Sequence, residues 1–277
     1  MAIQSLKLNT GAQIPQVGLG LWQVLPGFVA KKTVKTGLAA GYRHFDSAQV
    51  YHNEQHLGTA LKESKFKRDE VFITTKIASN RIGGNNQEKD KLIPSFERSL
   101  KKLQTDYVDL LLLHFPRPET RQAAWPIMEQ IYQSGRAKSI GVSNYMVKHL
   151  EELLADCKVK PAVNQIELHV FLQMPEVVEF CQKNDIIVEA YSPLAHGKGI
   201  DDPILSKIAK KHSKTNAQIM LRWCVEIGTV PLPKSTHAER IQENLEIFDF
   251  KLDAEDMTAI KGLERNLRTC WDPTIVP

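Results

Sequence analysis

The sequence has few cysteines, no long apolar run and no N-terminal targeting pattern, and each absence narrows the class of protein. Its four cysteines, at positions 157, 181, 224 and 270, form no C-x-x-C pair and have no histidine at zinc-ligand spacing. This predicts reduced thiols and no metal site. No stretch of about 18 apolar residues occurs, and the first residues lack the basic and apolar segments of a signal peptide. We therefore expect a cytoplasmic protein that does not enter a membrane.

The sequence also lacks a concentration of charge. Its net charge is +4, and its acidic and basic residues are interspersed along the chain. The densest basic run, residues 207–214, has apolar residues at helical spacing, which favours a solvated helix face over a nucleic-acid patch. With 277 residues, 42% of them hydrophobic, the chain can bury a large core. No linker or low-complexity segment interrupts it, so residues 1–277 are expected to form one domain, as a monomer without a nucleic-acid partner.

What the sequence does have is a regular alternation of strand-length apolar runs with helical segments. Residues 5–8, a turn at 9–11 and a short run through Ile14 first predict a hairpin. Eight strand candidates follow, separated by helical patterns. They are residues 17–22, 42–46, 71–77, 107–114, 137–144, 162–168, 185–192 and 228–233.

Two architectures compete for such a pattern, an open doubly wound sheet and a closed (β/α)8 TIM barrel. A doubly wound dinucleotide fold would need a glycine-rich turn that leads into a helix. The sole candidate is the run VGLGLW, with Gly18 and Gly20, which lacks both the third glycine and the helix start. The length also suits a barrel of roughly 250 residues. We predict an α/β (β/α)8 TIM barrel with an N-terminal β-hairpin capping the barrel bottom.

Polar residues stand where several of the apolar runs stop. Asp46, Lys76 and His114 each end a strand candidate, and Tyr51 lies in the loop after Asp46. Taken singly, each has an ordinary structural explanation, such as a helix cap, a solvated lysine, a core histidine or a packed ring. Parallel strands of a barrel, however, carry their C-terminal ends to the same face, where barrel enzymes do their chemistry. The four residues are therefore expected to meet.

Together these groups can form a general acid. A tyrosine has an ordinary pKa of about 10 and donates protons poorly at neutral pH. A nearby Lys76 ammonium would lower the pKa of Tyr51, and Asp46 could pair with and orient the lysine. His114 could then fix a carbonyl oxygen that receives the proton.

Several ordered motifs make the chain resemble the aldo-keto reductase family, and their pattern is most similar to small bacterial reductases that resemble 2,5-diketo-D-gluconate reductase. The motifs are GYRHFDSAQVYHNEQHLG, VFITTK, LLLLHFP, IGVSNY, NQIELH, YSPL and LPKSTHAERIQENLEIFDF. By this resemblance Asp46, Tyr51, Lys76 and His114 match the catalytic tetrad of NADPH-dependent reductases of small aldehydes, ketones or keto-sugars. Side chains cannot supply a hydride, so a nicotinamide is required.

The resemblance also implies a set of cofactor residues. Ser143, Asn144 and Gln165 match the groups that bind the nicotinamide carboxamide, and Tyr191 matches the aromatic residue under its ring. The remaining matches are pyrophosphate positions in the YSPL motif and the 2′-phosphate and adenine site after the eighth strand: Ser192, Leu194, Lys234, Ser235, Thr236, Arg240 and Asn244. Basic residues and hydroxyls at that position suit an extra phosphate, which favours NADPH over NADH.

Departures from the family pattern concern the substrate pocket. Trp22 keeps its expected position, whereas Phe115 and Ala78 stand where tryptophan is common, so the pocket should be wider and less aromatic there. His52 stands for a common glycine, which leaves the shape of the Tyr51 loop open. The tail, residues 264–277, either folds over the substrate mouth or is a loosely docked terminus.

Two other functions are compatible with the pattern. One is a non-catalytic NADPH-binding scaffold or partner-binding protein on the same barrel, against which the complete tetrad argues. The other is an isomerase or aldolase that uses Lys76 as a Schiff-base nucleophile, which leaves the phosphate-site motif unexplained. His44 and His56, although close to Tyr51 in sequence, are expected to be a strand residue and a helix-surface residue.

Overall fold

The computed structural model describes residues 3–77, 91–118 and 120–277, which include an eight-stranded sheet. Every neighbouring pair is parallel, and the order in space follows the chain. The strands are β3 (Leu19–Gly20), β4 (His44–Asp46), β5 (Phe72–Ile77), β6 (Leu110–Leu113), β7 (Ile140–Ser143), β8 (Val163–Glu167), β9 (Ile187–Tyr191) and β10 (Val230–Leu232). Each lies within one of the eight predicted runs.

Backbone hydrogen bonds bring the first and last strands together into a barrel. Gly18 and Gly20 donate to the carbonyl oxygens of Pro231 and Pro233, each at 3.0 Å. A Cβ at Gly18 would come within 2.6 Å of Leu232 Cδ2 and 2.7 Å of His44 Nδ1, and one at Gly20 within 3.0 Å of the Leu232 carbonyl oxygen, so a side chain would crowd this contact. Gly18 and Gly20, which do not form a dinucleotide-binding motif, thus lie where the barrel closes.

The N-terminal hairpin covers the opposite end of the barrel from the strand C-termini. Strands β1 (Ser5–Lys7) and β2 (Gln13–Pro15) pair antiparallel. Leu8 and Ile14, both buried, pack with Phe72, Leu110 and Val230, which begin β5, β6 and β10. The predicted cap on the barrel bottom is confirmed.

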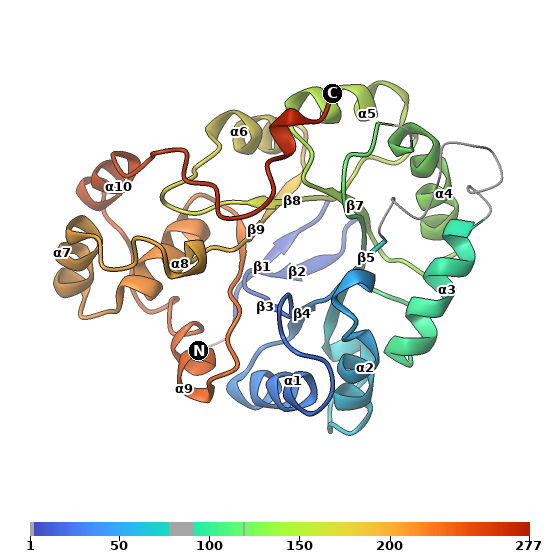
Figure 1. The fold of residues 1–277 in the computed structure, drawn as a ribbon, viewed down its shortest axis with the longest axis horizontal. Coiled ribbons are helices and arrows are strands. Elements are labelled where there is room, and N and C mark those ends of the chain that lie inside the picture. The colour runs from blue at the N-terminus through green and yellow to red at the C-terminus, as the bar shows by residue number, and fades with distance from the viewer. Residues whose placement is uncertain (1–2, 78–90, 119) are drawn as a thin grey trace.

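Helices surround the strands as an outer ring (Figure 1). They bury apolar side chains against the outside of the sheet, as the predicted helical periodicity requires. The α-helices are α1 (Phe28–Ala40), α2 (Glu54–Lys62), α3 (Leu92–Leu103), α4 (Arg121–Gln133), α5 (Val147–Asp156), α6 (Pro175–Lys183), α7 (Pro203–His212), α8 (Asn216–Glu226), α9 (Ala238–Glu243) and α10 (Ala254–Lys261). Short 3-10 turns are η1 (Gln49–Tyr51), η2 (Arg68–Glu70), η5 (Ala195–Gly197) and η6 (Pro273–Ile275).

Residues 207–212 of the basic run form the last turns of α7, and residues 213 and 214 directly follow the helix. Lys211 pairs with Asp253 and Asp256, and Lys214 pairs with Asp249. The predicted helix face is therefore confirmed, and its charges are partly balanced by the chain itself. All four cysteines are free thiols. Among the residues that the structure describes, no helix combines the length and hydropathy needed to cross a bilayer.

Candidate active site

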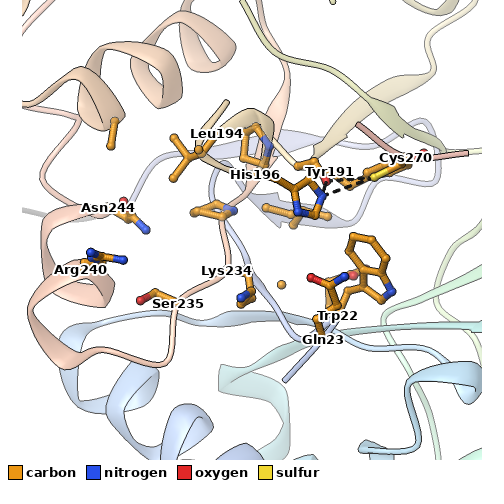
Figure 2. Close-up of a pocket in the computed structure, with 18 of the residues that line it drawn as sticks. Trp22, Gln23, Tyr191, Leu194, His196, Lys234, Ser235, Arg240, Asn244 and Cys270 are labelled. Atoms are coloured by element: carbon orange, nitrogen blue, oxygen red, sulfur yellow. Dashed lines mark hydrogen bonds between the residues drawn. The ribbon is translucent and has the colours of Figure 1, made fainter. Parts of the chain in front are cut away.

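A cavity of about 880 Å³ opens at the C-terminal ends of the strands. Nearly all predicted site residues line it, and Lys76 is completely buried. The predicted residues in its lining are Trp22, Asp46, Tyr51, His114, Phe115, Ser143, Asn144, Gln165, Tyr191, Ser192, Leu194, Lys234, Ser235, Thr236, Arg240 and Asn244. Figure 2 shows Arg240, Ser235 and Asn244 at one end of the cavity and Trp22 with Cys270 at the other.

A buried ion pair forms the base of the site. Asp46 ends β4 opposite Thr74 of β5, and Lys76 lies two residues further along β5, so its long side chain can reach the Asp46 carboxylate. Lys76 Nζ lies 2.6 Å from both carboxylate oxygens of Asp46 and 2.9 Å from the Ser47 carbonyl oxygen. These three acceptors satisfy the ammonium, which explains how a lysine can be fully buried here.

Tyr51 and His114 lie on the cavity side of this pair. Lys76 Nζ is 4.9 Å from the centroid of the Tyr51 ring, and the Tyr51 and His114 rings meet edge to face at 5.7 Å. Tyr51 ends η1, and His52 after it adopts a left-handed conformation with φ 58°. The loop thus keeps the backbone that glycine would favour, although histidine occupies the position. The four predicted tetrad residues are together.

The electrostatics of Tyr51 differ from the sequence prediction. Burial raises its pKa well above the ordinary value, and the Asp46 carboxylate, followed by Cys270 and Glu189, raises it further. The expected net lowering of the Tyr51 pKa is wrong for this arrangement, because burial and the Asp46 carboxylate, which also pairs with Lys76, outweigh the charge of the lysine. Tyr51 is therefore protonated throughout the physiological range.

His114 is held as a neutral imidazole. Burial, and then the charge of Lys76, lower its pKa well below the ordinary value. Its Nδ1 has no hydrogen-bond partner among the described residues, and its ring stacks on Phe115 at 4.4 Å with an interplanar angle of 9°. A neutral histidine fixed in this way can donate one N–H bond to an oxygen in the cavity.

Amide and hydroxyl groups from β7, β8 and β9 interlock beside the tetrad. The Ser143 hydroxyl donates to the Gln165 carbonyl oxygen at 2.9 Å, and Asn144 Nδ2 donates to the His114 carbonyl oxygen at 2.9 Å. The Tyr191 hydroxyl donates to Asn144 Oδ1 at 2.7 Å. Side chains tied together in this way are held rigidly before any ligand arrives.

The other end of the cavity contains two cationic side chains. Lys234, Ser235 and Thr236 follow β10, and Arg240 lies in α9. Within residues 3–77, 91–118 and 120–277, neither Lys234 nor Arg240 forms an ion pair with a carboxylate. Two exposed cations with hydroxyls between them suit a phosphate group.

The C-terminal tail supplies residues that the sequence analysis did not assign. The buried Glu167 carboxylate, at the end of β8, accepts from Thr269 N at 2.7 Å, Thr269 Oγ1 at 2.6 Å and Cys270 N at 3.3 Å. Further on, Arg121 donates to the Pro277 carbonyl oxygen at 2.7 Å. The tail thus crosses the barrel from α10 to the neighbourhood of α5 (Figure 1). Of the two alternatives, folding over the mouth is the correct one.

The tail and two loops build the walls of the mouth. Trp271 meets Phe115 edge to face at 5.5 Å, and Trp22 meets His196 in the same way at 5.4 Å. Cys270 also lines the cavity. Phe115 and Trp22 are where the sequence placed them, whereas the Ala78 position, which bears on the predicted pocket width, lies outside the described residues.

Comparisons with known proteins agree with this geometry. Residues 16–199 and 201–265 match the model of the Aldo/keto reductase family. A glyoxal reductase of Bacillus subtilis is 41% identical over 269 residues, covering 97% of this chain and 96% of its own length. A methylglyoxal reductase of Yersinia pestis is 40% identical over 280 residues, covering 99% and 98%. A solved aldo-keto reductase complexed with NADPH superposes with a TM-score of 0.90 at 31% identity, covering 97% of this chain and 90% of the other.

Proposed function

Since the chain belongs to the aldo/keto reductase family and is an NADPH-dependent carbonyl reductase, we propose that Tyr51 donates the proton in this reaction and that small dicarbonyl compounds are among its substrates. The observation that carries the proposal is the convergence of Tyr51, His114 and the buried Asp46–Lys76 pair on one cavity. The same end of the barrel also offers a phosphate site.

NADPH, when bound, supplies a hydride to the carbonyl carbon. The Tyr51 hydroxyl gives its proton to the carbonyl oxygen, so that the product is an alcohol and Tyr51 is left as a phenolate. Lys76, whose ammonium lies 4.9 Å from that ring, stabilises the phenolate, and Asp46 holds the ammonium in place. The neutral His114 orients the carbonyl oxygen through its N–H group.

The residues present fit this cofactor. We propose that Ser143, Asn144 and Gln165 hold the nicotinamide carboxamide, and that Tyr191 supports the ring. Ser192 and Leu194 contact the pyrophosphate, and the cationic end of the cavity takes the 2′-phosphate and adenine through Lys234, Ser235, Thr236, Arg240 and Asn244. The unpaired Lys234 and Arg240 of the described chain support this orientation, because an ion pair would have neutralised them.

The substrate end of the cavity combines aromatic and polar side chains. Trp22, Phe115 and Trp271 give it an aromatic wall, and Tyr51 with His114 supply its polar groups. The relatives named glyoxal and methylglyoxal reductase support short dicarbonyls as substrates. The test is NADPH consumption with glyoxal and methylglyoxal, in which no turnover across these and a panel of other small carbonyls would refute the proposal.

Replacement of Arg240 by alanine should weaken NADPH binding by about 10- to 100-fold, because a charge-assisted hydrogen bond to phosphate contributes about 1.5–3 kcal/mol. NADH, which lacks the 2′-phosphate, should lose much less. The dissociation constants of both cofactors, followed by fluorescence quenching, give the comparison. Arg98→Ala, at an exposed position on α3 outside the cavity lining, is the matched control. Equal losses for NADPH and NADH would contradict the phosphate assignment.

Replacement of Glu167 by alanine should release the tail and raise the carbonyl KM by about tenfold, because three hydrogen bonds to a carboxylate are lost. NADPH affinity should change less, since Glu167 does not line the cavity. Trp271→Ala removes the indole ring from the cavity mouth but leaves the Glu167 contacts. Its carbonyl KM should rise about as much as that of Glu167→Ala, while its tail stays attached. Limited proteolysis reports tail release, and a tail cut no faster than in the wild type would count against this account.

Neither competing function is favoured. The homologous reductases support catalysis over a scaffold role. A Schiff base on Lys76 would require the lysine to leave three hydrogen bonds inside a fully buried site. The cytoplasmic location, the monomeric state and a single domain over residues 1–277 stay predictions.

A further inference from the structure

A second carboxyl group lies in the barrel beneath the tetrad. Glu189, in β9, is completely buried, although side chains inside such barrels are mostly apolar. Its partner in the parallel register with β8 is Gln165. A buried carboxyl group without a cation is unfavourable, so its presence calls for an explanation.

Gln165 connects Glu189 to the ion pair. Gln165 Nε2 donates to Glu189 Oε2 at 2.7 Å and to Asp46 Oδ2 at 2.9 Å. Both amide hydrogens are therefore used inside the barrel, which leaves Oε1 as the amide atom available to the cavity. A continuous chain of contacts runs from Glu189 through Gln165 and Asp46 to Lys76.

Burial and the nearby Asp46 carboxylate favour the neutral form of Glu189. Lys76 is already paired with Asp46, and no hydrogen bond reaches Glu189 Oε1 from any described residue. His44 Nε2 lies 3.5 Å from that oxygen and also contacts Thr74 Oγ1 at 3.0 Å. Burial and the Asp46 carboxylate raise the pKa of Glu189 to about 8, and burial lowers the pKa of His44 to about 3. At neutral pH both groups are therefore uncharged.

We propose that Glu189 is a positioning residue of the reductase site: its carboxyl group holds the Gln165 amide so that Oε1 faces the nicotinamide carboxamide. This inference rests on the proposed function, because it takes Gln165 as a cofactor residue. Loss of the Glu189 proton places a second negative charge near Tyr51, where it opposes the phenolate that forms during reduction. Carbonyl reduction should therefore decline as the pH rises past about 8.

Two substitutions separate the effect of the Glu189–Gln165 hydrogen bond from the effect of ionising Glu189. Glu189→Gln keeps an oxygen that accepts from Gln165 but cannot ionise. Glu189→Leu keeps a similar volume and removes the acceptor, which frees the Gln165 amide to turn. At pH 7 we expect the NADPH dissociation constant of Glu189→Gln to stay within about twofold of the wild type, and that of Glu189→Leu to rise about three- to tenfold. Fluorescence titration measures both.

The pH profile of kcat and the pH dependence of unfolding both report whether Glu189 carries its proton. In the native protein Glu189 keeps its proton up to a pKa of about 8, whereas its ordinary value is 4.5. The unfolded chain therefore binds fewer protons across this window, and the contribution of Glu189 to stability falls as the pH rises from about 4.5 to 8. In the unfolded chain His44 titrates around its ordinary value of 6.5, but it does so equally in the wild type and in Glu189→Gln, so its effect cancels when the two proteins are compared from pH 6.5 to 8. Over that interval the unfolding constant of the wild type should rise about tenfold more than that of Glu189→Gln.

These measurements decide between the outcomes. The proposal is supported if Glu189→Gln loses both the fall in kcat above pH 8 and the extra pH dependence of unfolding, and if Glu189→Leu binds NADPH more weakly. Wild-type NADPH affinity in Glu189→Leu overturns the positioning role, and an unchanged pH profile in Glu189→Gln overturns the role of the proton. Should Glu189→Leu fail to fold, the pH measurements on Glu189→Gln decide alone. A wild-type protein without NADPH turnover refutes the proposed function instead, and the unfolding comparison still tests the proton.

Discussion

Replacement of Tyr51 by phenylalanine should lower kcat for carbonyl reduction by about 10²- to 10⁴-fold, the usual contribution of a positioned general acid. The ring, its edge contact with His114 and its place beneath the cavity stay the same, and only the proton is lost. NADPH affinity should therefore stay close to that of the wild type. Steady-state kinetics and a fluorescence titration on the same preparation separate the two quantities.

Tyr107→Phe provides the control for this prediction. Tyr107 lies just before β6, at the other end of the barrel, where its ring packs under Arg68 and Lys138. We expect removal of the Tyr107 hydroxyl group to leave kcat unchanged. A Tyr51→Phe enzyme that retains more than about a tenth of wild-type kcat would exclude Tyr51 as the principal proton donor, since general acids contribute at least about 10²-fold.

Replacement of Lys76 by methionine should lower the free energy of unfolding by about 3–5 kcal/mol and also abolish most activity. Methionine fills a similar volume but leaves the Asp46 carboxylate buried without its cation. It also removes the charge that stabilises a Tyr51 phenolate. Denaturant unfolding and steady-state kinetics measure the two effects.

A second substitution tests whether the loss comes from the unpaired carboxylate. Adding Asp46→Asn to Lys76→Met should restore part of the stability, because a neutral amide is less unfavourable to bury than a carboxylate. Lys31→Met, which breaks an exposed pair with Glu63, should change stability little. If the free energy of unfolding of Lys76→Met lies within about 1 kcal/mol of the wild-type value, the buried Asp46–Lys76 pair does not stabilise the fold as expected.

The fold and the tetrad were predictable because they depend on local pattern and on one rule of barrels. Asp46, Lys76 and His114 each end an apolar run, and parallel strands bring such ends to one face. The cofactor residues needed the family resemblance, since Gln165 or Tyr191 alone is an ordinary strand-end residue. All the cofactor residues that the resemblance implied line the cavity.

Other parts of the site depend on contacts between distant segments. Glu167 lies in an apolar strand pattern, and nothing near it in the sequence indicates that it binds residues about a hundred positions later. Trp271, which directly follows these residues, lies in the cavity lining. The pKa of Tyr51 was predicted in the wrong direction because burial and the balance of Asp46 against Lys76 exist only in the folded barrel. Glu189 was overlooked for the same reason, since its inward orientation follows from the strand register.

The most direct test of the central claim is isotope transfer from NADPH labelled with deuterium at the reactive position of the nicotinamide. Wild-type protein incubated with this cofactor and methylglyoxal should yield an alcohol that carries deuterium on the former carbonyl carbon, as read by mass spectrometry. The label should appear at least about 10²-fold more slowly with Tyr51→Phe. An unlabelled alcohol, or no alcohol at all from the wild-type protein with methylglyoxal and the panel of other small carbonyls, would contradict a hydride-transferring reductase at this cavity.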